Sequence, residues 1–525
     1  MKRSRTLAIS CALLLPVVGG AFYAQTKSTR PGADLLTQVL SLVSERYVDT
    51  LPADSVYEKA ASGLVRELND PYSVLLTPAD LKRFNNQTGG QYAGVGMQIV
   101  QQQNQTTVET VFPGTPAAAG GVREGDRIIQ VDSTPTAGLS LDQVSDRLTG
   151  PEGTTVKARF SRPGVAAPID LTFRRAVIHV PAVPYTLVMN GGVGYIPFTI
   201  FNENAAHDVE TAVQSLSARG VHGIIIDMRG NPGGILTQSL EIANQFLKQG
   251  QEIASVKGRD SLEQTYNAEH APIAPSVPII VMVNGGTASA AEIVTGALQD
   301  HDRALVVGQT SFGKGLVQTV YNLDGGYALK LTTAKWYTPS GRSIQRPRKF
   351  VNGQFVQDTP DSTETNASKK SRPAYHSDAG RVVYGGGGIT PDVIVPEDTL
   401  TAAEQKYVRA IAPKSQQEFT TRWDYTLELS KQKPLQLQVQ PAWLDTFYQR
   451  LQSAGVAVDR QTYNGASRYI GYLLQRQVTA FALGDSAAKR LDLPYDAPLQ
   501  KAIALMGRGG SQRDLFAYAG APLSH

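Results

Sequence analysis

Two residues that lie 25 positions apart, Ser289 and Lys314, each have neighbours that would make the side chain reactive. Ser289 follows the apolar run 278–283 and precedes the helix-like stretch 290–298, a pattern that predicts a strand, a tight turn and a helix. A serine at the start of a helix lies beside backbone N–H groups that have no acceptor within the helix, and such groups can bind a developing oxyanion. The N–H of Ala290 is the natural donor, so this segment has the features of a hydrolase.

The hydroxyl of a serine is a poor nucleophile at neutral pH, so a base must remove its proton. The seven histidines form no His-x-x-x-His pattern, and the sequence contains no Gly-x-Ser-x-Gly elbow. Lys314 lies between two glycines that permit close approach, and Phe312, Leu316 and Val317 could shield it from water. Burial lowers the pKa of a lysine from about 10.4 towards neutrality, and a neutral amine can act as a general base. Taken singly, a helix-capping serine and a solvated lysine remain the commoner interpretations.

Taken together, these segments resemble the active site of the C-terminal processing peptidases, also called tail-specific proteases. The resemblance rests on Ala-Ser-Ala-Ala-Glu around Ser289, on Phe-Gly-Lys-Gly around Lys314, and on Gln318 four residues further on. It implies that Ser289 is the nucleophile, that Lys314 is the general base and that Gln318 orients the lysine. Ala291 departs from the family pattern, because many members have a second small hydroxyl residue there; we expect no effect on the serine and lysine.

A second segment of the same family pattern follows the strand-like run 223–226. It reads Asp-Met-Arg-Gly-Asn-Pro-Gly-Gly over 227–234 and resembles the family's Arg-x-Asn-Pro-Gly-Gly turn. The resemblance implies that a backbone N–H of Gly233 or Gly234 is the second oxyanion donor beside Ala290. Without the resemblance, an ordinary β-turn would be the better interpretation.

A competing motif overlaps Lys314. Residues 308–314 fit the first seven positions of a phosphate-binding P-loop, which would indicate an NTPase. The eighth position is Gly315, so the Ser or Thr hydroxyl that should hold Mg²⁺ is absent. The sequence therefore argues against nucleotide binding.

Length and composition fit a multidomain exported protein. The chain has 525 residues, of which 41% are hydrophobic and 18% charged, and this length suggests about three domains. The net charge of +4, from 50 basic and 46 acidic residues, is too balanced to indicate a nucleic-acid partner. The single cysteine, Cys11, lies in the N-terminal apolar segment, so no disulfide can form within the chain.

Residues 1–24 have the pattern of an export signal, because Lys2, Arg3 and Arg5 precede the apolar run 7–24. This run is near the lower limit for spanning a bilayer, so a cleaved signal peptide and a retained membrane anchor are both open. We expect a periplasmic or cell-envelope protein that is either free or anchored to the inner membrane.

Residues 89–175 resemble a PDZ domain. One segment resembles the loop of such domains that binds a chain terminus, and its residues are Gly94, Val95, Gly96 and Met97. Successive backbone N–H groups in such a loop can bind a terminal carboxylate, and the strand that follows can pair with the peptide. The segments that begin at Pro113 and Glu124 match the later turn, helix and strand of the same module. The module implies a protein ligand with a free C-terminus.

The resemblance and the order of elements together predict an α/β protease core of the ClpP/crotonase-like kind, with an inserted PDZ domain and helical N- and C-terminal regions. Strand-like and helix-like runs alternate in the core, at 194–198, 205–218, 223–226, 236–247, 278–283 and 288–298. Outside the PDZ domain the assignments are an N-terminal helical region at 34–88, the core at 176–345, a polar insertion or mobile loop at 346–385, the last core strand at 386–399, and a C-terminal helical region at 400–525.

Two of these assignments leave alternatives. The apolar faces of the N-terminal helices could pack on the core or pair with another chain, and packing within the chain is the default. The C-terminal region is either a packing extension or a docking or oligomer surface. A second copy of the chain and an adaptor protein are both open as partners.

The sequence therefore predicts a serine endopeptidase with a Ser-Lys dyad that recognises and cleaves the C-terminal tails of exported proteins. We expect it to need no ATP, metal or other cofactor and to act on proteins with free, apolar C-termini. The alternative is a catalytically silent PDZ scaffold that binds C-termini. A scaffold has no need for Ser289, Lys314 and Gln318 together.

Overall fold

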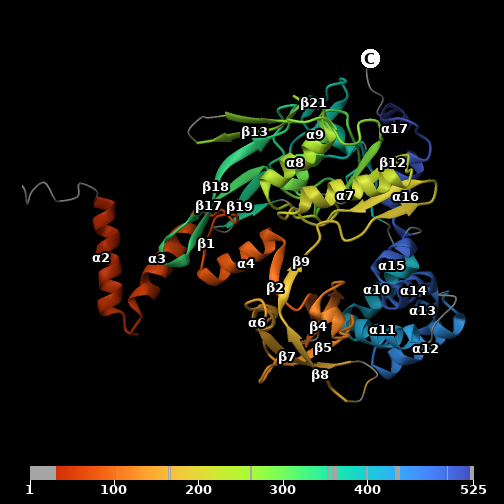
Figure 1. Ribbon diagram of the computed structural model, residues 1–525, viewed down its shortest axis with the longest axis horizontal. Helices are drawn as coiled ribbons and strands as arrows, with labels where there is room; N and C mark the ends of the chain where they lie inside the picture. The colour runs from red at the N-terminus through yellow and green to blue at the C-terminus, as the bar shows by residue number, and fades with distance from the viewer. Residues whose placement is uncertain are drawn as a thin grey trace, which may run out of the picture. The chain divides into compact units, whose positions relative to one another are not determined.

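The computed structural model describes residues 31–102, 105–162, 165, 167–259, 263–351, 354–357, 364–365, 367–397, 400–431, 438–492 and 495–520. The chain divides into two compact units, Met1–Pro78 with Gln318–Thr332 and Ala79–Val317 with Thr333–His525 (Figure 1). The predicted export segment, residues 1–24, lies outside the described residues. Within the described ranges, no helix is long and apolar enough to cross a membrane.

In its described residues, the first unit contains two α-helices and a short antiparallel ladder. Its N-terminal elements are α2 (Pro31–Arg46), α3 (Ala53–Arg66) and β1 (Val74–Leu76). Strand β1 pairs with residues 328–330 of β18 (Ala328–Tyr337). The apolar side chains of α2 remain exposed, by 63% at Leu35 and by 59% at Leu42. Packing of these helices on the core or against another chain stays a prediction, because periodicity predicts an apolar helix face and not what covers it.

The predicted PDZ domain is an antiparallel sheet with two helices and a core of its own. Its main elements are β3 (Met97–Gln102), β4 (Gln105–Val111), α5 (Pro116–Ala119), β5 (Arg127–Val131), α6 (Leu141–Leu148), β7 (Thr155–Ser161) and β8 (Ile169–Arg174). Alternate residues of β7, namely Val156, Ala158 and Phe160, are buried, as expected for a strand with one face on the core. Strand β2 (Gln91–Gly94) pairs with β9 (Ala176–His179), so the chain enters and leaves the module through one ribbon, as an inserted domain does.

A six-stranded sheet forms the protease core. Its strands, in spatial order, are β10 (Leu187–Met189), β11 (Val193–Pro197), β12 (Gly223–Asp227), β15 (Ile279–Val283), β16 (Leu305–Gly308) and β23 (Val393–Ile394). All neighbours are parallel except β10 and β11. Strand β12 is buried at every residue, with Ile224 and Ile226 facing one apolar cluster and Ile225 facing another. Burial on both faces explains its continuous apolar run.

Helices cover both faces of this sheet. One face packs against α7 (Ala205–Ala218), α8 (Leu236–Phe246) and α9 (Ala290–Asp300). The other face packs against α16 (Ala497–Met506) and α17 (Gln512–Tyr518), which lie beside the core in Figure 1 although they come from the end of the chain. The end of the C-terminal region is therefore a layer of the protease core, an arrangement that the sequence did not indicate.

The rest of the C-terminal region is a helical bundle around a separate apolar cluster. Its helices are α10 (Ala402–Ile411), α11 (Ser415–Ser430), α12 (Pro441–Ser453), α13 (Arg460–Gly465), α14 (Ser467–Leu483) and α15 (Asp485–Asp492). A second sheet near the core joins β13 (Glu252–Gly258), β14 (Glu263–Asn267) and residues 334–337 of β18.

The segment 346–385, predicted to be an insertion or mobile loop, has regular structure in its described part. It contains two hairpins, β19 (Arg348–Val351) with β20 (Gln354–Gln357) and β21 (Ala374–His376) with β22 (Val382–Tyr384). Two of its arginines form largely buried ion pairs: Arg372 binds Glu364 at 2.6 Å, and Arg381 binds Asp302 at 2.9 Å. The sequence did not predict these hairpins, because paired buried charges leave no apolar periodicity in a sequence.

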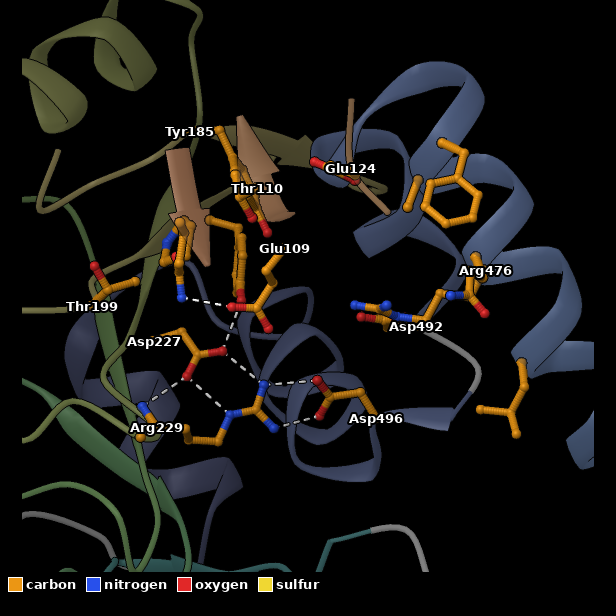
Figure 2. A pocket seen from close by; sticks show the side chains of 18 of the residues that line it. Glu109, Thr110, Glu124, Tyr185, Thr199, Asp227, Arg229, Arg476, Asp492 and Asp496 are labelled. Atoms are coloured by element: carbon orange, nitrogen blue, oxygen red, sulfur yellow. Dashed lines mark hydrogen bonds and ion pairs between the residues drawn. The ribbon is translucent and has the colours of Figure 1, made fainter. Parts of the chain in front are cut away.

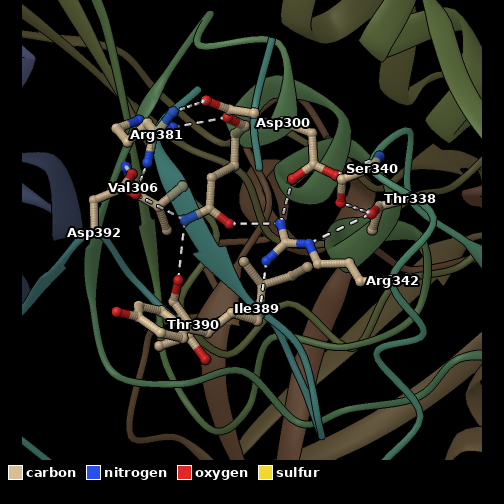
Figure 3. Close-up of polar contacts among 12 residues, drawn as sticks. Asp300, Val306, Thr338, Ser340, Arg342, Arg381, Ile389, Thr390 and Asp392 are labelled. Atoms are coloured by element: carbon tan, nitrogen blue, oxygen red, sulfur yellow. Dashed lines mark hydrogen bonds and ion pairs between the residues drawn. The ribbon is translucent and has the colours of Figure 1, made fainter. Parts of the chain in front are cut away.

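One of these charge networks holds the C-terminal end of α9 (Figure 3). The guanidinium of Arg342 is fully buried and donates to Asp300 at 2.6 Å and to the side chain of Gln299 at 2.7 Å. Arg381 donates to the backbone carbonyl of Gln299 at 2.8 Å. These hydrogen bonds hold the last residues of α9, so the network fixes the end of the helix that begins beside Ser289.

Candidate active site

Ser289 lies at the turn between β15 and α9 in a strained backbone conformation. Its φ is 56° and its ψ is −117°, and it is one of only four non-glycine residues with positive φ in the described part of the chain. Such a conformation costs on the order of 1–3 kcal/mol and persists only where the surrounding structure imposes it. The predicted strand, turn and helix are present, and the turn presents a partly exposed serine at a helix N-terminus.

A buried carboxylate imposes this geometry. Glu292, in the first turn of α9, has no exposed surface, and its Oε2 accepts the backbone N–H of Ser289 at 2.8 Å. The same oxygen accepts the backbone N–H of Lys314 at 2.8 Å. Glu292 Oε1 accepts the N–H of Gly313 at 2.7 Å and the hydroxyl of Ser311 at 2.5 Å. One side chain therefore ties the segment of Lys314 to that of Ser289.

Sequence reasoning included Glu292 in a family motif but assigned it no role. The available signal was the spacing Ser-x-x-Glu, which is a capping box in which the glutamate accepts the N–H of the serine. Burial raises the pKa of Glu292, while the hydrogen bonds from Ser311, Lys314, Gly313 and Ser289 favour its ionised form. An ionised carboxylate has no hydrogen-bond donor and several acceptor positions, so Glu292 can accept hydrogen bonds from all four donors.

The glycines around Lys314 allow the close approach that the sequence predicted. A Cβ on Gly313 would lie 2.9 Å from the backbone nitrogen of Gly388, and a Cβ on Gly315 would lie 2.8 Å from that of Gln345. The backbone carbonyl of Lys314 accepts the indole N–H of Trp336 at 3.1 Å. Lys314 itself is half-buried, so its loop is packed on several sides.

The turn that carries Gly233 and Gly234 lies directly against the start of α9. A Cβ on Gly233 would lie 2.6 Å from the carbonyl of Ala288 and 2.9 Å from the nitrogen of Ala290. The two glycines are not equivalent as donors, because the N–H of Gly233 already binds the side chain of Asn231 at 2.9 Å.

Gly234 forms a parallel bridge with Phe201. The hydrogen bonds of this bridge join Phe201 to the two neighbours of Gly234, namely to the carbonyl of Gly233 and to the N–H of Ile235. Its own N–H therefore points away from Phe201, and Gly234 is exposed. Within the part of the chain that the structure describes, the N–H groups of Gly234 and Ala290 have no hydrogen-bond acceptor. Of the predicted oxyanion donors, the geometry favours Ala290 and Gly234 over Gly233.

Gln318 lies on strand β17 (Leu316–Asn322), in the first unit, whereas Ser289 and Lys314 belong to the second. Its side-chain nitrogen is buried and has no hydrogen-bond partner among the described residues. An orienting role for Gln318 stays a prediction.

The predicted carboxylate-binding loop borders a groove of the PDZ domain. Val95 and Met97 line a cavity of about 390 Å³ together with Leu148 of α6, Tyr92 and residues of α4 (Pro78–Gly89). Gly96 has a φ of 89°, and a Cβ there would lie 2.3 Å from Thr115. Burial raises the pKa of Tyr92 to about 12, although nearby backbone N–H groups of Met97 and Gly96 lower it. Those N–H groups therefore lie close to the hydroxyl of Tyr92, a residue that also lines the groove.

A second cavity, of about 780 Å³, lies beside the turn 227–234 (Figure 2). Its walls include Asp227 and Arg229 of the turn, Glu124 of the PDZ domain, and Trp423 and Arg476 of the C-terminal helices. Parts of the chain that are far apart in sequence therefore meet beside this turn.

Comparisons with known proteins agree with this geometry. A sequence model described as peptidase family S41 matches residues 192–350, and a PDZ domain model matches residues 85–157. The carboxy-terminal-processing protease of Bartonella bacilliformis is 38% identical over 313 residues, which are 58% of this chain and 71% of that protein. The carboxy-terminal processing protease CtpA of Bacillus subtilis is 32% identical over 359 residues, which are 68% of this chain and 76% of that protein. The chain belongs to the carboxy-terminal processing proteases of peptidase family S41.

As a member of family S41, the chain is a serine protease, and it carries a PDZ domain. The predicted family, fold class and enzyme class are therefore confirmed, which places this S41 protein among enzymes rather than silent scaffolds. A solved structure titled photosystem II D1 C-terminal processing protease is 30% identical and covers 61% of this chain and 85% of that protein, with a TM-score of 0.36. The S41 model ends at residue 350, so it does not include α16.

Proposed function

We propose that this S41 protease cleaves near the C-termini of exported proteins, with Ser289 as nucleophile and Lys314 as general base. The observation that carries the proposal is the shared acceptor: the backbone N–H groups of Ser289 and Lys314 bind the same oxygen of Glu292. This arrangement holds a hydroxyl and an amine in one small, rigid region, as a nucleophile and its base require.

The reaction follows from these positions. Lys314, as the neutral amine, takes the proton of the Ser289 hydroxyl while the oxygen attacks the carbonyl carbon of the scissile peptide bond. The oxyanion that forms is stabilised by the N–H groups of Ala290 and Gly234. The C–N bond then breaks, and the protonated Lys314 returns the proton to the leaving amine.

The acyl-enzyme that remains is hydrolysed by water. Lys314 takes a proton from the attacking water, and the second tetrahedral intermediate collapses to release the new carboxylic acid. The proton then returns to the Ser289 oxygen, so the enzyme is restored without ATP. Gln318 would orient the lysine in both steps.

Substrate selection belongs to the PDZ domain in this proposal. Its groove of about 390 Å³ combines apolar walls with the turn at Gly96, which suits an apolar side chain and a terminal carboxylate. The composition of residues 1–24 supports export to the periplasm or cell envelope, with or without a retained membrane anchor.

The test is cleavage of an unfolded protein with a free apolar C-terminus by the purified full-length chain without ATP. The variants Ser289→Ala and Lys314→Ala should each abolish cleavage while their circular dichroism spectra match the wild type. Losses in the double variant should not add, because the two residues act as one unit. Normal turnover by a folded Lys314→Ala variant would show that another base serves Ser289.

A further inference from the structure

A carboxylate from the end of the chain reaches the turn beside Ser289. Asp496 precedes α16, and its Oδ1 accepts the backbone N–H of Leu499 at 3.0 Å, which caps the helix. The same carboxylate binds the guanidinium of Arg229 through two parallel hydrogen bonds, of 2.8 and 2.7 Å (Figure 2). Bidentate pairs of this kind fix the orientation of both groups.

Arg229 is held from two sides. Its Nε donates to Asp227 at 2.9 Å and its Nη2 donates to the other oxygen of Asp227 at 2.7 Å. Asp227 also accepts the hydroxyl of the buried Tyr195 at 2.7 Å. Burial alone would lower the pKa of Arg229, but Asp227 and Asp496 raise it above its ordinary value, so the guanidinium stays charged. The side chains of Arg229 and Asp496 are only 15% and 9% exposed, so water screens this pair weakly.

The turn that Arg229 anchors is bonded to the segment leading into Ser289. The N–H of Gly230 donates to the Asn284 side chain at 2.9 Å, and the hydroxyl of Thr287 donates to the carbonyl of Met228 at 2.8 Å. The N–H of Ala288 donates to the carbonyl of Asn231 at 2.9 Å. A shift of Arg229 would therefore move both the turn and the residues directly before Ser289.

Asp496 is mounted on a rigid support. Leu499, Ala502 and Met506 of α16 are fully buried against the second face of the core sheet. Met506 packs so closely on β12 that a Cβ at Gly223 would lie 2.2 Å from its sulfur. A group that positions others must itself be held by packing, and Asp496 meets this condition.

We propose that Asp496 is a positioning residue for proteolysis. Acting through Arg229, it holds the turn with Gly233 and Gly234 against the start of α9, so the C-terminal segment contributes to the catalytic core. This inference rests on the proposed function, in which the N–H of Gly234 binds the oxyanion.

The variant Asp496→Asn tests the proposal, because asparagine caps a helix as well as aspartate does while it removes the charge that binds Arg229. We expect kcat for an unfolded protein with an apolar free C-terminus to fall roughly 10- to 100-fold, as for a small misplacement near reacting atoms. KM should stay within about twofold, because the PDZ groove that binds the tail is unchanged.

Asp492→Asn is the matched control. Asp492 belongs to the same region and binds Arg476 at 2.8 Å and Tyr472 at 3.0 Å, both within the C-terminal helices. Its variant should keep kcat within about twofold of the wild type. In an Arg229→Met background, Asp496→Asn should cause little further loss, because it acts through that residue.

Three results would overturn the inference: an unchanged kcat in Asp496→Asn, an equal loss of kcat in Asp492→Asn, or full additivity with Arg229→Met. Failure of the proposed function gives a different result, namely continued cleavage by Ser289→Ala. In that event the Asp496→Asn comparison still reports whether this carboxylate serves the reaction that the protein performs.

Discussion

The backbone N–H groups of Ser289 and Lys314 donate to one oxygen atom of a buried carboxylate, each over 2.8 Å. The two residues thus have a fixed separation that does not depend on their flexible side chains. Because the acceptor belongs to the first turn of α9, the same helix that starts at Ser289 also positions the lysine segment.

The first prediction concerns the shared acceptor. Glu292→Gln replaces one carboxylate oxygen by an NH₂ group. Each of the two oxygens accepts at least one backbone N–H, so at least one N–H loses its acceptor in either orientation of the amide. A buried unpaired donor costs about 1–3 kcal/mol, so we expect kcat to fall roughly 10- to 100-fold. Ser311→Ala removes only one of the four donors and should lose less. Steady-state kinetics on both variants, with circular dichroism as a check of folding, provide the measurement; equal activity of Glu292→Gln and wild type would contradict the assigned role.

The second prediction concerns pH. Burial raises the pKa of Glu292 above its ordinary value of 4.5. An acid with a higher pKa in the folded than in the unfolded state stabilises the fold at pH values below its unfolded pKa. This stabilisation is lost as pH rises through the folded pKa. Activity needs the ionised carboxylate and should rise over the same interval. Thermal unfolding of wild type and Glu292→Gln from about pH 4 to 8 should show the wild type losing relative stability with rising pH, because the glutamine does not titrate. A difference in stability that stays constant with pH would refute this.

The third prediction compares two glycines of one turn that both have positive φ. A Cβ on Gly233 would lie 2.6 Å from the carbonyl of Ala288, whereas a Cβ on Gly230 would meet nothing within 4 Å. Both alanine variants pay the cost of a left-handed conformation, about 1 kcal/mol, but only Gly233→Ala also pushes the turn away from the start of α9. We expect Gly233→Ala to lose most activity and Gly230→Ala to keep a large part of it. Similar losses in both would show that strain, and not contact with α9, matters.

The fourth prediction concerns the helical bundle. Hydrogen bonds from Arg468, each 2.9 Å, hold the pKa of the buried Glu404 at about 2. A lowered carboxyl pKa gives stability that is present above the unfolded pKa and lost as pH falls through the folded one. Arg468→Ala should therefore destabilise the protein by roughly 1–3 kcal/mol at neutral pH. The difference should vanish as pH falls from about 4.5 to about 2.

Urea unfolding followed by circular dichroism measures this effect, and Arg450→Ala serves as control. Arg450 pairs with Glu428 at 2.8 Å, but both side chains are exposed, by 37% and 55%. Exposed pairs contribute at most about 1 kcal/mol, so Arg450→Ala should change stability little. An equally large loss in the control would mean that general surface charge explains the result.

The fifth prediction concerns recognition of the chain terminus. Amidation of a peptide removes the charge that the N–H groups at Gly96 and Met97 would bind, at a cost of about 1–3 kcal/mol. The full-length Ser289→Ala variant should bind the amide at least several-fold more weakly than the free acid. Gly96→Ala should reduce the difference, because its Cβ would lie 2.3 Å from Thr115. Equal affinity for acid and amide would indicate that the module does not read the terminus.

The features that the sequence predicted are local ones. The predicted helix at 205–218 matches α7 (Ala205–Ala218), because its apolar periodicity and its boundaries are contained in the segment itself. The strand, turn and helix around Ser289 were predicted for the same reason.

What the sequence could not supply is pairing across long distances. Arg229 and Asp496 are separated by 267 positions, and neither lies in a pattern that indicates the other. The same holds for Arg342 and Asp300, which look like surface residues in the sequence and are buried because they pair. The choice between Gly233 and Gly234 also could not be made from the sequence, since it depends on which N–H the side chain of Asn231 already binds.

Because a chain is synthesised from its N-terminus, α16 and α17 are made long after the sheet face that they cover. The second face of the core sheet begins to form with β10, at Leu187–Met189, yet its cover arrives only with residues 497–518. A chain that is still being synthesised therefore carries a protease core with one apolar face uncovered. Because domains fold as units once their last element is available, the core can mature only after residues 497–518 have emerged. Synthesis of α16 and α17 must therefore come before proteolysis.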